Sequence, residues 1–135
     1  MKLKWGAFTD TGMVRQQNED SFLAEENLFV VADGMGGHNA GEVASALAVT
    51  TLKSGARLGI NSTEQFRELV QLANTAIYTA SLDDNTQSGM GTTLTAMSIV
   101  ADVEPRVLIA NVGDSRTYLW RNGVLTRLSG DHSYV

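Results

Sequence analysis

A short apolar run that ends in a glycine-rich segment is the feature that most constrains this fold. Asn27 precedes Leu28–Ala32, which is apolar throughout and fits a strand buried on both faces. Asp33-Gly34-Met35-Gly36-Gly37 follows, a sequence that we expect to end any regular element. The pattern predicts a core strand that delivers a carboxylate to its carboxyl end.

Two helices are predicted after this segment. Val43, Ala44, Leu47, Ala48 and Leu52 recur at helical spacing, and glycines follow them. Ser62 and Gln65 then form a capping box for a second helix, which we expect to end at Asp83-Asp84-Asn85.

Strands are predicted on both sides of the helices. Asn-Gly within 121–123 is a strong hairpin signal between the last two strands. Because strands and helices do not alternate, we expect an α+β fold, in which an antiparallel β-sandwich is flanked by helices. The predicted strands are Lys4–Thr9, Ser21–Ala24, Leu28–Ala32, Thr92–Ala101, Val107–Val112, Thr117–Trp120 and Val124–Leu128.

Composition excludes several classes of protein. The net charge is -5, with no Lys/Arg cluster, which argues against nucleic acid and membrane surfaces as partners. The chain has no cysteine and therefore no disulfide, thiolate metal ligand or cysteine nucleophile. No apolar run approaches the length of a membrane span, so we expect a soluble cytoplasmic protein.

Acidic residues gather around the ends of the predicted core strands. Asp33 and Asp114 each follow an apolar strand, and Glu19-Asp20 precedes another. Neighbouring carboxylates repel unless one is protonated or a cation lies between them. Oxygen ligands suit Mg²⁺, Mn²⁺ or Ca²⁺ better than zinc. Two such ions could hold a bridging hydroxide and a phosphate, and Arg15 would offer a planar fork to the phosphate oxygens.

Five motifs, in this order, resemble those of the metal-dependent protein phosphatases (PPM, or type 2C), in particular their bacterial branch. Together they cover nearly the whole chain, which makes the resemblance specific. The motifs are Arg15-Gln16-Gln17-Asn18-Glu19-Asp20, Val31-Ala32-Asp33-Gly34-Met35-Gly36-Gly37-His38, Gly89-Met90-Gly91-Thr92-Thr93-Leu94, Asn111-Val112-Gly113-Asp114-Ser115-Arg116 and Asp131-His132-Ser133.

The resemblance implies hydrolysis of phosphoserine and phosphothreonine in proteins by a hydroxide that bridges two metal ions, Mn²⁺ or Mg²⁺. It also implies phosphoprotein substrates and, functionally, a cognate Ser/Thr kinase. The implied roles are Asp33 as the carboxylate that bridges both metals, the Gly34 carbonyl as a ligand of the second metal, Asp20 as a ligand of that metal through water, Glu19 as its neighbour in the water shell, Arg15 as the phosphate-binding residue and Asp114 as a ligand of a third metal.

The sequence departs from the family in two respects. Met35 stands where some eukaryotic members have a His proposed as general acid, and a thioether cannot transfer a proton. Nothing matches the family's later Ser-Asp-Gly and Asp-Asn segments, which ligate the first metal. We therefore expect residues 1–135 to be the N-terminal part of a single catalytic domain, with little or no activity alone.

Two other interpretations compete with this one. A nucleotide-binding turn is disfavoured because position 39 is Asn, which breaks the GxGxxG spacing, and there is no Walker lysine. A truncated, non-catalytic fragment that binds metal or a partner, or self-associates through open sheet edges, stays open. Asp10, His38 and His132 are expected to be turn or loop residues, and Asp131 is a weaker candidate for the site.

Overall fold

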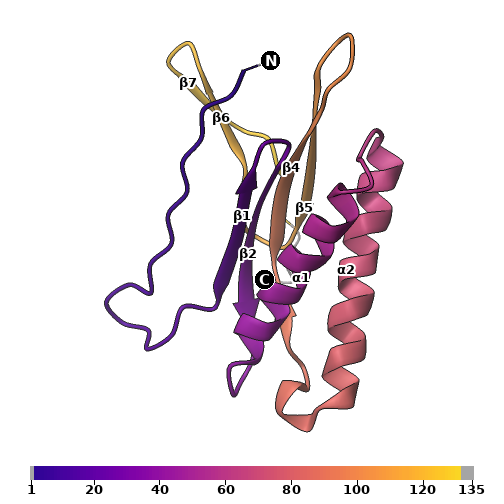
Figure 1. Cartoon of the computed structure of the whole chain (residues 1–135). Coiled ribbons are helices and arrows are strands. Elements are labelled where there is room, and N and C mark those ends of the chain that lie inside the picture. Colours follow the sequence, from indigo (N-terminus) through magenta and orange to yellow (C-terminus); the bar gives the residue numbers. More distant parts are fainter. Residues whose placement is uncertain (1, 132–135) are drawn as a thin grey trace.

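An antiparallel sheet of five strands forms the centre of the protein, with two helices packed on one face (Figure 1). This computed structural model describes residues 2–131. The strand order is β1-β2-β4-β5, and the short β3 pairs with β2 off that path. The strands are β1 (Asp20–Glu25), β2 (Leu28–Met35), β3 (Gly91–Thr92), β4 (Leu94–Val100) and β5 (Arg106–Val112).

Both predicted helices are present. α1 (Ala40–Ala56) lies against β1 and β2, and α2 (Thr63–Asp83) packs on α1 and leads into a short 3-10 turn, η1 (Asn85–Gln87). The predicted N-cap is confirmed, since the Ser62 hydroxyl accepts a hydrogen bond from the Gln65 amide at 3.1 Å. The Gln65 side chain accepts from the Asn61 amide at 2.7 Å, one residue before the Ser62 amide that a full capping box would use. Apolar side chains of both helices meet those of β2, β4 and β5 in one core, in which Leu52 is fully buried.

β2 differs from its prediction in two ways. It continues through Asp33, Gly34 and Met35, because Gly34 and Met35 pair with Thr92 and Gly91 of β3. Its burial alternates: Leu28, Val30, Ala32 and Gly34 are buried, whereas Val31 is 49% exposed. The helices cover only one face of the sheet, so the expectation of a strand buried on both faces is wrong for the described residues.

The predicted strand Lys4–Thr9 is also wrong. Residues 2–10 have no regular structure and pair with no strand. They run along the sheet face opposite the helices, where the Trp5 ring packs edge-on against Phe29 at 5.7 Å (Figure 1). This segment is attached by side chains, and without a backbone ladder it does not form a strand.

The last two strands form the predicted hairpin, a separate two-stranded sheet. β6 (Tyr118–Arg121) and β7 (Val124–Arg127) are joined by Asn122 and Gly123, with φ of 52° and 77°. Positive φ at both residues is typical of a type I′ turn. Antiparallel sheets with helices outside confirm the predicted α+β class. No helix among residues 2–131 is long and apolar enough to cross a membrane.

Candidate metal and phosphate site

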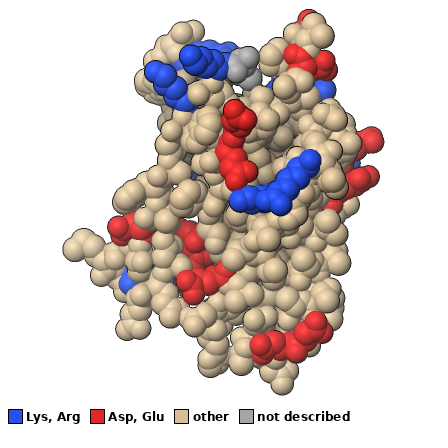
Figure 2. Space-filling model, viewed as in Figure 1, with Lys and Arg blue, Asp and Glu red and all other residues tan. Residues whose placement is uncertain are grey.

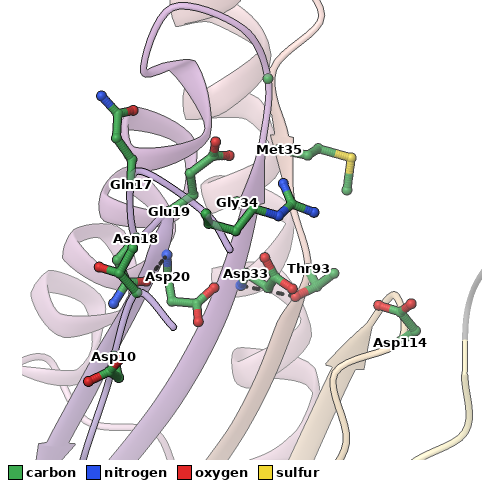
Figure 3. Close-up of a pocket in the computed structure, with 13 residues that line it drawn as sticks. Asp10, Gln17, Asn18, Glu19, Asp20, Asp33, Gly34, Met35, Thr93 and Asp114 are labelled. Carbon is green, nitrogen blue, oxygen red and sulfur yellow. Dashed lines mark hydrogen bonds between the residues drawn. The ribbon is translucent and has the colours of Figure 1, made fainter. Parts of the chain in front are cut away.

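A polar cleft of about 510 Å³ opens where the N-terminal loop meets the carboxyl end of β2. Figure 2 shows acidic side chains gathered at the lower left of the molecule, beside this loop. Figure 3 shows the cleft in close-up. Its lining residues are Asp10, Thr11, Arg15, Gln17, Asn18, Glu19, Asp20, Asp33, Gly34, Met35, Gly36, Thr93 and Asp114. All six predicted site residues are among them.

Asp20 and Asp33 form the centre of the cleft. They are directly paired in the register of β1 and β2, and their carboxylates lie close together in Figure 3. Partial burial raises the pKa of the Asp33 carboxyl, and repulsion from and hydrogen bonding with Asp20 raise it further. The more distant Asp114 adds to this effect, whereas the positive charge of Arg15 opposes it. The paired carboxylates therefore favour a proton or a cation between them.

The backbone of Asp33 is fixed by Thr93, between β3 and β4. The Asp33 amide donates to the Thr93 hydroxyl at 3.0 Å, and the Thr93 amide donates to the Asp33 carbonyl at 2.9 Å. The Thr93 hydroxyl also lies 2.6 Å from that of Ser115, the neighbour of Asp114. Thr93 thus connects the two acidic segments. The sequence patterns place Thr93 in a predicted strand and in the third motif but assign no role to its hydroxyl. Its position just after Gly89 and Gly91 in that motif was the available signal.

Two glycines next to Asp33 in space, Gly34 of β2 and Gly41 of α1, let their backbones and that of Glu19 approach closely. A Cβ on Gly34 would collide with the Gly41 carbonyl of α1 and lie 2.8 Å from the Glu19 carbonyl. A Cβ on Gly41 would collide with the Glu19 carboxylate. Glu19 is therefore packed against the first turn of α1, while its neighbour Asp20 faces Asp33.

The loop that carries Arg15 is held by side-chain hydrogen bonds. Asn18 accepts from the Asp20 amide at 3.0 Å and donates to the Thr9 hydroxyl at 2.7 Å. Arg15 is exposed on the cleft wall. A guanidinium beside a carboxylate pair can bind an anion once the carboxylates are neutralised by cations.

The weaker candidates lie elsewhere or act locally. Asp131 does not line the cleft; it forms a two-point ion pair with Arg116, at 3.0 and 2.7 Å. Asp10 lines the cleft, but its carboxylate accepts from the Gly12 amide at 2.7 Å, as expected of a turn residue. His38 is a loop residue with φ of 52°, as expected, and His132 lies outside the described residues.

The donor set of the cleft fits hard divalent cations. Carboxylate, carbonyl and amide oxygens surround it, and these suit Mg²⁺ or Mn²⁺. Within residues 2–131, however, no three acidic or histidine side chains converge closely enough to hold a metal by themselves. The cleft offers one tight carboxylate pair, and further ligands would be backbone oxygens, water or other residues.

Comparison with known proteins assigns this fold and cleft to a family. Residues 4–134 match the family model described as Protein phosphatase 2C. The chain belongs to this family.

Several bacterial relatives are similar over most of the chain. The Serine/threonine phosphatase stp of Listeria monocytogenes is 44% identical over 138 residues, covering 94% of this chain and 54% of the relative. The Serine/threonine protein phosphatase PstP of Mycobacterium tuberculosis is 39% identical, covering 98% of this chain and 26% of the relative.

Solved structures show the same fold. The crystal structure of the M. tuberculosis phosphatase PstP/Ppp superposes with a TM-score of 0.83 at 39% identity, covering 93% of this chain and 53% of that one. A PstP catalytic domain in complex with two manganese ions gives a TM-score of 0.82 at 38% identity. The chain thus spans about half of these structures, at 53% and 54% of their length.

Proposed function

We propose that this chain provides part of the active site of a phosphatase that hydrolyses phosphoserine and phosphothreonine in proteins and depends on Mn²⁺ or Mg²⁺. The observation that carries the proposal is the facing pair Asp20 and Asp33 in a cleft that also presents Arg15. The named activity of the bacterial relatives and the manganese-bound PstP structure support it.

The residues of the cleft divide into metal ligands and a phosphate ligand. Asp33 would contact two cations, Asp20 would hold one of them through water with Glu19 beside it, the Gly34 carbonyl would bind the same cation, and Asp114 would hold a third. When bound, such cations lower the pKa of a coordinated water and neutralise the phosphate oxygens.

Arg15 would bind the non-bridging phosphate oxygens and so orient the ester. A guanidinium matches these oxygens in a planar, two-point geometry that an ammonium does not offer. Met35 lines the cleft at 55% exposure and has no proton to give. The leaving Ser or Thr oxygen would therefore take its proton from solvent. A phosphorylated protein, and indirectly the kinase that phosphorylates it, would be the partners.

A second candidate is a metal- or partner-binding module without turnover. It is favoured by the lack of any group of three close metal-ligating side chains in residues 2–131. The two candidates share Mn²⁺ binding at Asp33 and differ in phosphate release.

Two measurements on this chain test the proposal. We expect Mn²⁺ binding, followed by isothermal titration calorimetry, to be lost in Asp33→Asn. The matched control is Glu68→Gln, which removes one exposed carboxylate of α2 and should bind Mn²⁺ as the wild type does. Equal Mn²⁺ affinity in wild type and Asp33→Asn would refute the metal site and, with it, the phosphatase assignment.

Phosphate release from a phosphothreonine peptide then separates the two candidates. We expect turnover by this chain to be low, because the described part of the cleft provides few direct ligands. Mn²⁺-dependent release that Asp33→Asn abolishes would establish the enzyme in this chain alone. Mn²⁺ binding without any release would favour the binding module or a partial site.

A further inference from the structure

One buried hydroxyl connects α1 to the segment that carries Glu19 and Asp20. Ser45 has no exposed surface (0%), although it is a polar residue in the middle of a helix. Its Oγ lies 2.7 Å from the Glu19 carbonyl oxygen, 2.9 Å from the Ser21 Oγ and 3.2 Å from the Glu42 carbonyl oxygen. Three partners thus surround one hydroxyl, one each from the end of the N-terminal loop, from β1 and from α1 itself.

The distances indicate where the Ser45 proton goes. A hydroxyl has one hydrogen, so Ser45 can donate fully to only one carbonyl. A buried helical Ser commonly donates to a carbonyl one turn back, which here is that of Glu42. The Glu19 carbonyl is closer by half an ångström, at 2.7 against 3.2 Å, and is the better acceptor. The Ser21 hydroxyl can then donate to Ser45, giving a chain from Ser21 through Ser45 to Glu19.

The Glu19 carbonyl is also the last acceptor of the ladder between β1 and β2. Glu19 lies one residue before β1 begins, and its carbonyl accepts a hydrogen bond from the Gly34 amide at 3.2 Å. Residues 2–19 contain no helix or strand, so the loop that bears Arg15 meets the regular structure at this carbonyl. Its two donors come from β2 and α1. Losing the closer one would leave a single long hydrogen bond at the point where the ladder ends.

We propose that Ser45 is a positioning residue, which fixes the Glu19–Asp20 backbone against Gly34 and thereby sets the spacing of the Asp20 and Asp33 carboxylates. Ser45 touches neither cation nor phosphate; it acts through the Glu19 carbonyl. The role toward the site rests on the proposed function, since the carboxylate spacing matters for cation binding. Packing constrains the approach of Glu19 to Gly34 a second time, because neither Gly34 nor Gly41 has room for a Cβ.

The test uses Ser45→Ala and measures two properties. Amide hydrogen exchange of Gly34, followed by NMR without metal, reports the hydrogen bond to Glu19; we expect it to be about tenfold faster, the effect of one lost buried hydrogen bond. Mn²⁺ affinity, followed by calorimetry, should fall roughly tenfold, as it does when residues that orient metal ligands are substituted.

Two controls separate this role from general destabilisation. Thr51→Val removes a hydroxyl from the same helix that donates only to the Leu47 carbonyl, at 2.7 Å, and should leave both properties unchanged. Ser21→Ala keeps the Ser45–Glu19 bond and should change Gly34 exchange much less than Ser45→Ala. If Ser45→Ala does not fold, Ser45→Cys replaces it, since a thiol fills the site but donates weakly.

The outcomes are distinct. Faster Gly34 exchange together with weaker Mn²⁺ binding, in the Ser45 variant alone, supports the proposal. Wild-type exchange at Gly34, or faster exchange with unchanged Mn²⁺ affinity, overturns it. If the wild type binds no Mn²⁺, the proposed function fails and the role toward the site fails with it, while the exchange rates still show whether Ser45 holds the Glu19 backbone.

Discussion

Asp20 and Asp33 lie opposite each other in neighbouring antiparallel strands, at the end of the sheet where β1 begins and β2 is about to finish. Directly opposite side chains of such strands have Cβ atoms about 4.5–5.5 Å apart. Like charges in this arrangement destabilise a sheet. The protein therefore keeps an unfavourable pair at the centre of its cleft, as is common at functional sites that lower folding stability.

The metal-free protein should become more stable when this repulsion is removed. The pKa of Asp33 is raised above its ordinary value by partial burial and by Asp20. Because the folded state then holds the proton more tightly than the unfolded state, stability falls as pH rises through the unfolded pKa, about 3.9, and levels off above the folded pKa. Asp33→Asn should remove this pH-dependent loss, giving a higher melting temperature at pH 7 and little change at pH 3.

Calorimetric melting curves in a chelating buffer would measure this effect. Glu68→Gln again serves as the matched control, because its carboxylate is exposed on α2 and should change the melting temperature little at either pH. A lower melting temperature for Asp33→Asn at pH 7 would show that the carboxylate pair stabilises the metal-free fold and that its repulsion is outweighed.

The ion pair between Arg116 and Asp131 should behave in the opposite way. Hydrogen bonding from the Arg116 guanidinium lowers the pKa of the Asp131 carboxyl. The ion pair therefore contributes to folding stability above the unfolded pKa of Asp131, and this contribution is lost as the pH falls through the folded pKa of Asp131. Asp131→Asn should therefore lower the melting temperature at pH 7 and not at pH 2. The effect should be small, since both side chains are partly exposed, at 43% and 32%.

Arg127 provides the comparison for this ion pair. Its guanidinium is 3.8 Å from the same carboxylate, whereas that of Arg116 is at 2.7 Å. Arg116→Gln should therefore lower the melting temperature at pH 7 more than Arg127→Gln does. Equal effects of the two substitutions would mean that long-range charge, and not the two-point hydrogen bonding of Arg116, stabilises the Asp131 carboxylate.

Features specified by neighbouring residues could be predicted from the sequence. Three such features are confirmed, and each acts within a few residues: the N-cap at Ser62, the apolar spacing of α1 and the Asn122-Gly123 turn. The grouping of Asp20, Asp33 and Asp114 in one cleft could also be predicted, because carboxylates at the ends of core strands reach a common edge.

Features that depend on a distant partner could not be predicted. The sequence predicts that Gly34 ends the strand, but it belongs to β2 because β3 pairs with it. The Gly41 backbone fills the space that a side chain at Gly34 would need. Lys4–Thr9 reads as a strand but has no ladder partner. The roles of the Thr93 and Ser45 hydroxyls arise only when separate elements meet, and propensity carries no information about that.

The core should depend strongly on Leu52 of α1, which is fully buried between the sheet and α2. Leu52→Ala should reduce the free energy of unfolding by about 2–5 kcal/mol, from lost burial and the cavity left behind. Leu58→Ala, at a residue 90% exposed, should change it by no more than about 0.5 kcal/mol. Urea denaturation measures both. Similar losses for the two variants would contradict the assigned core.

The close approach at Gly34 should make that position intolerant of any side chain. Gly34→Ala would place a Cβ against the Gly41 carbonyl of α1, and neither backbone can rotate away as a side chain could. We expect a loss of about 1–3 kcal/mol or more in the free energy of unfolding, measured by urea denaturation. Gly37→Ala is the matched control, because nothing lies within 4 Å of its Cβ position. If both variants were as stable as the wild type, β2 and α1 could not be packed backbone to backbone at this site.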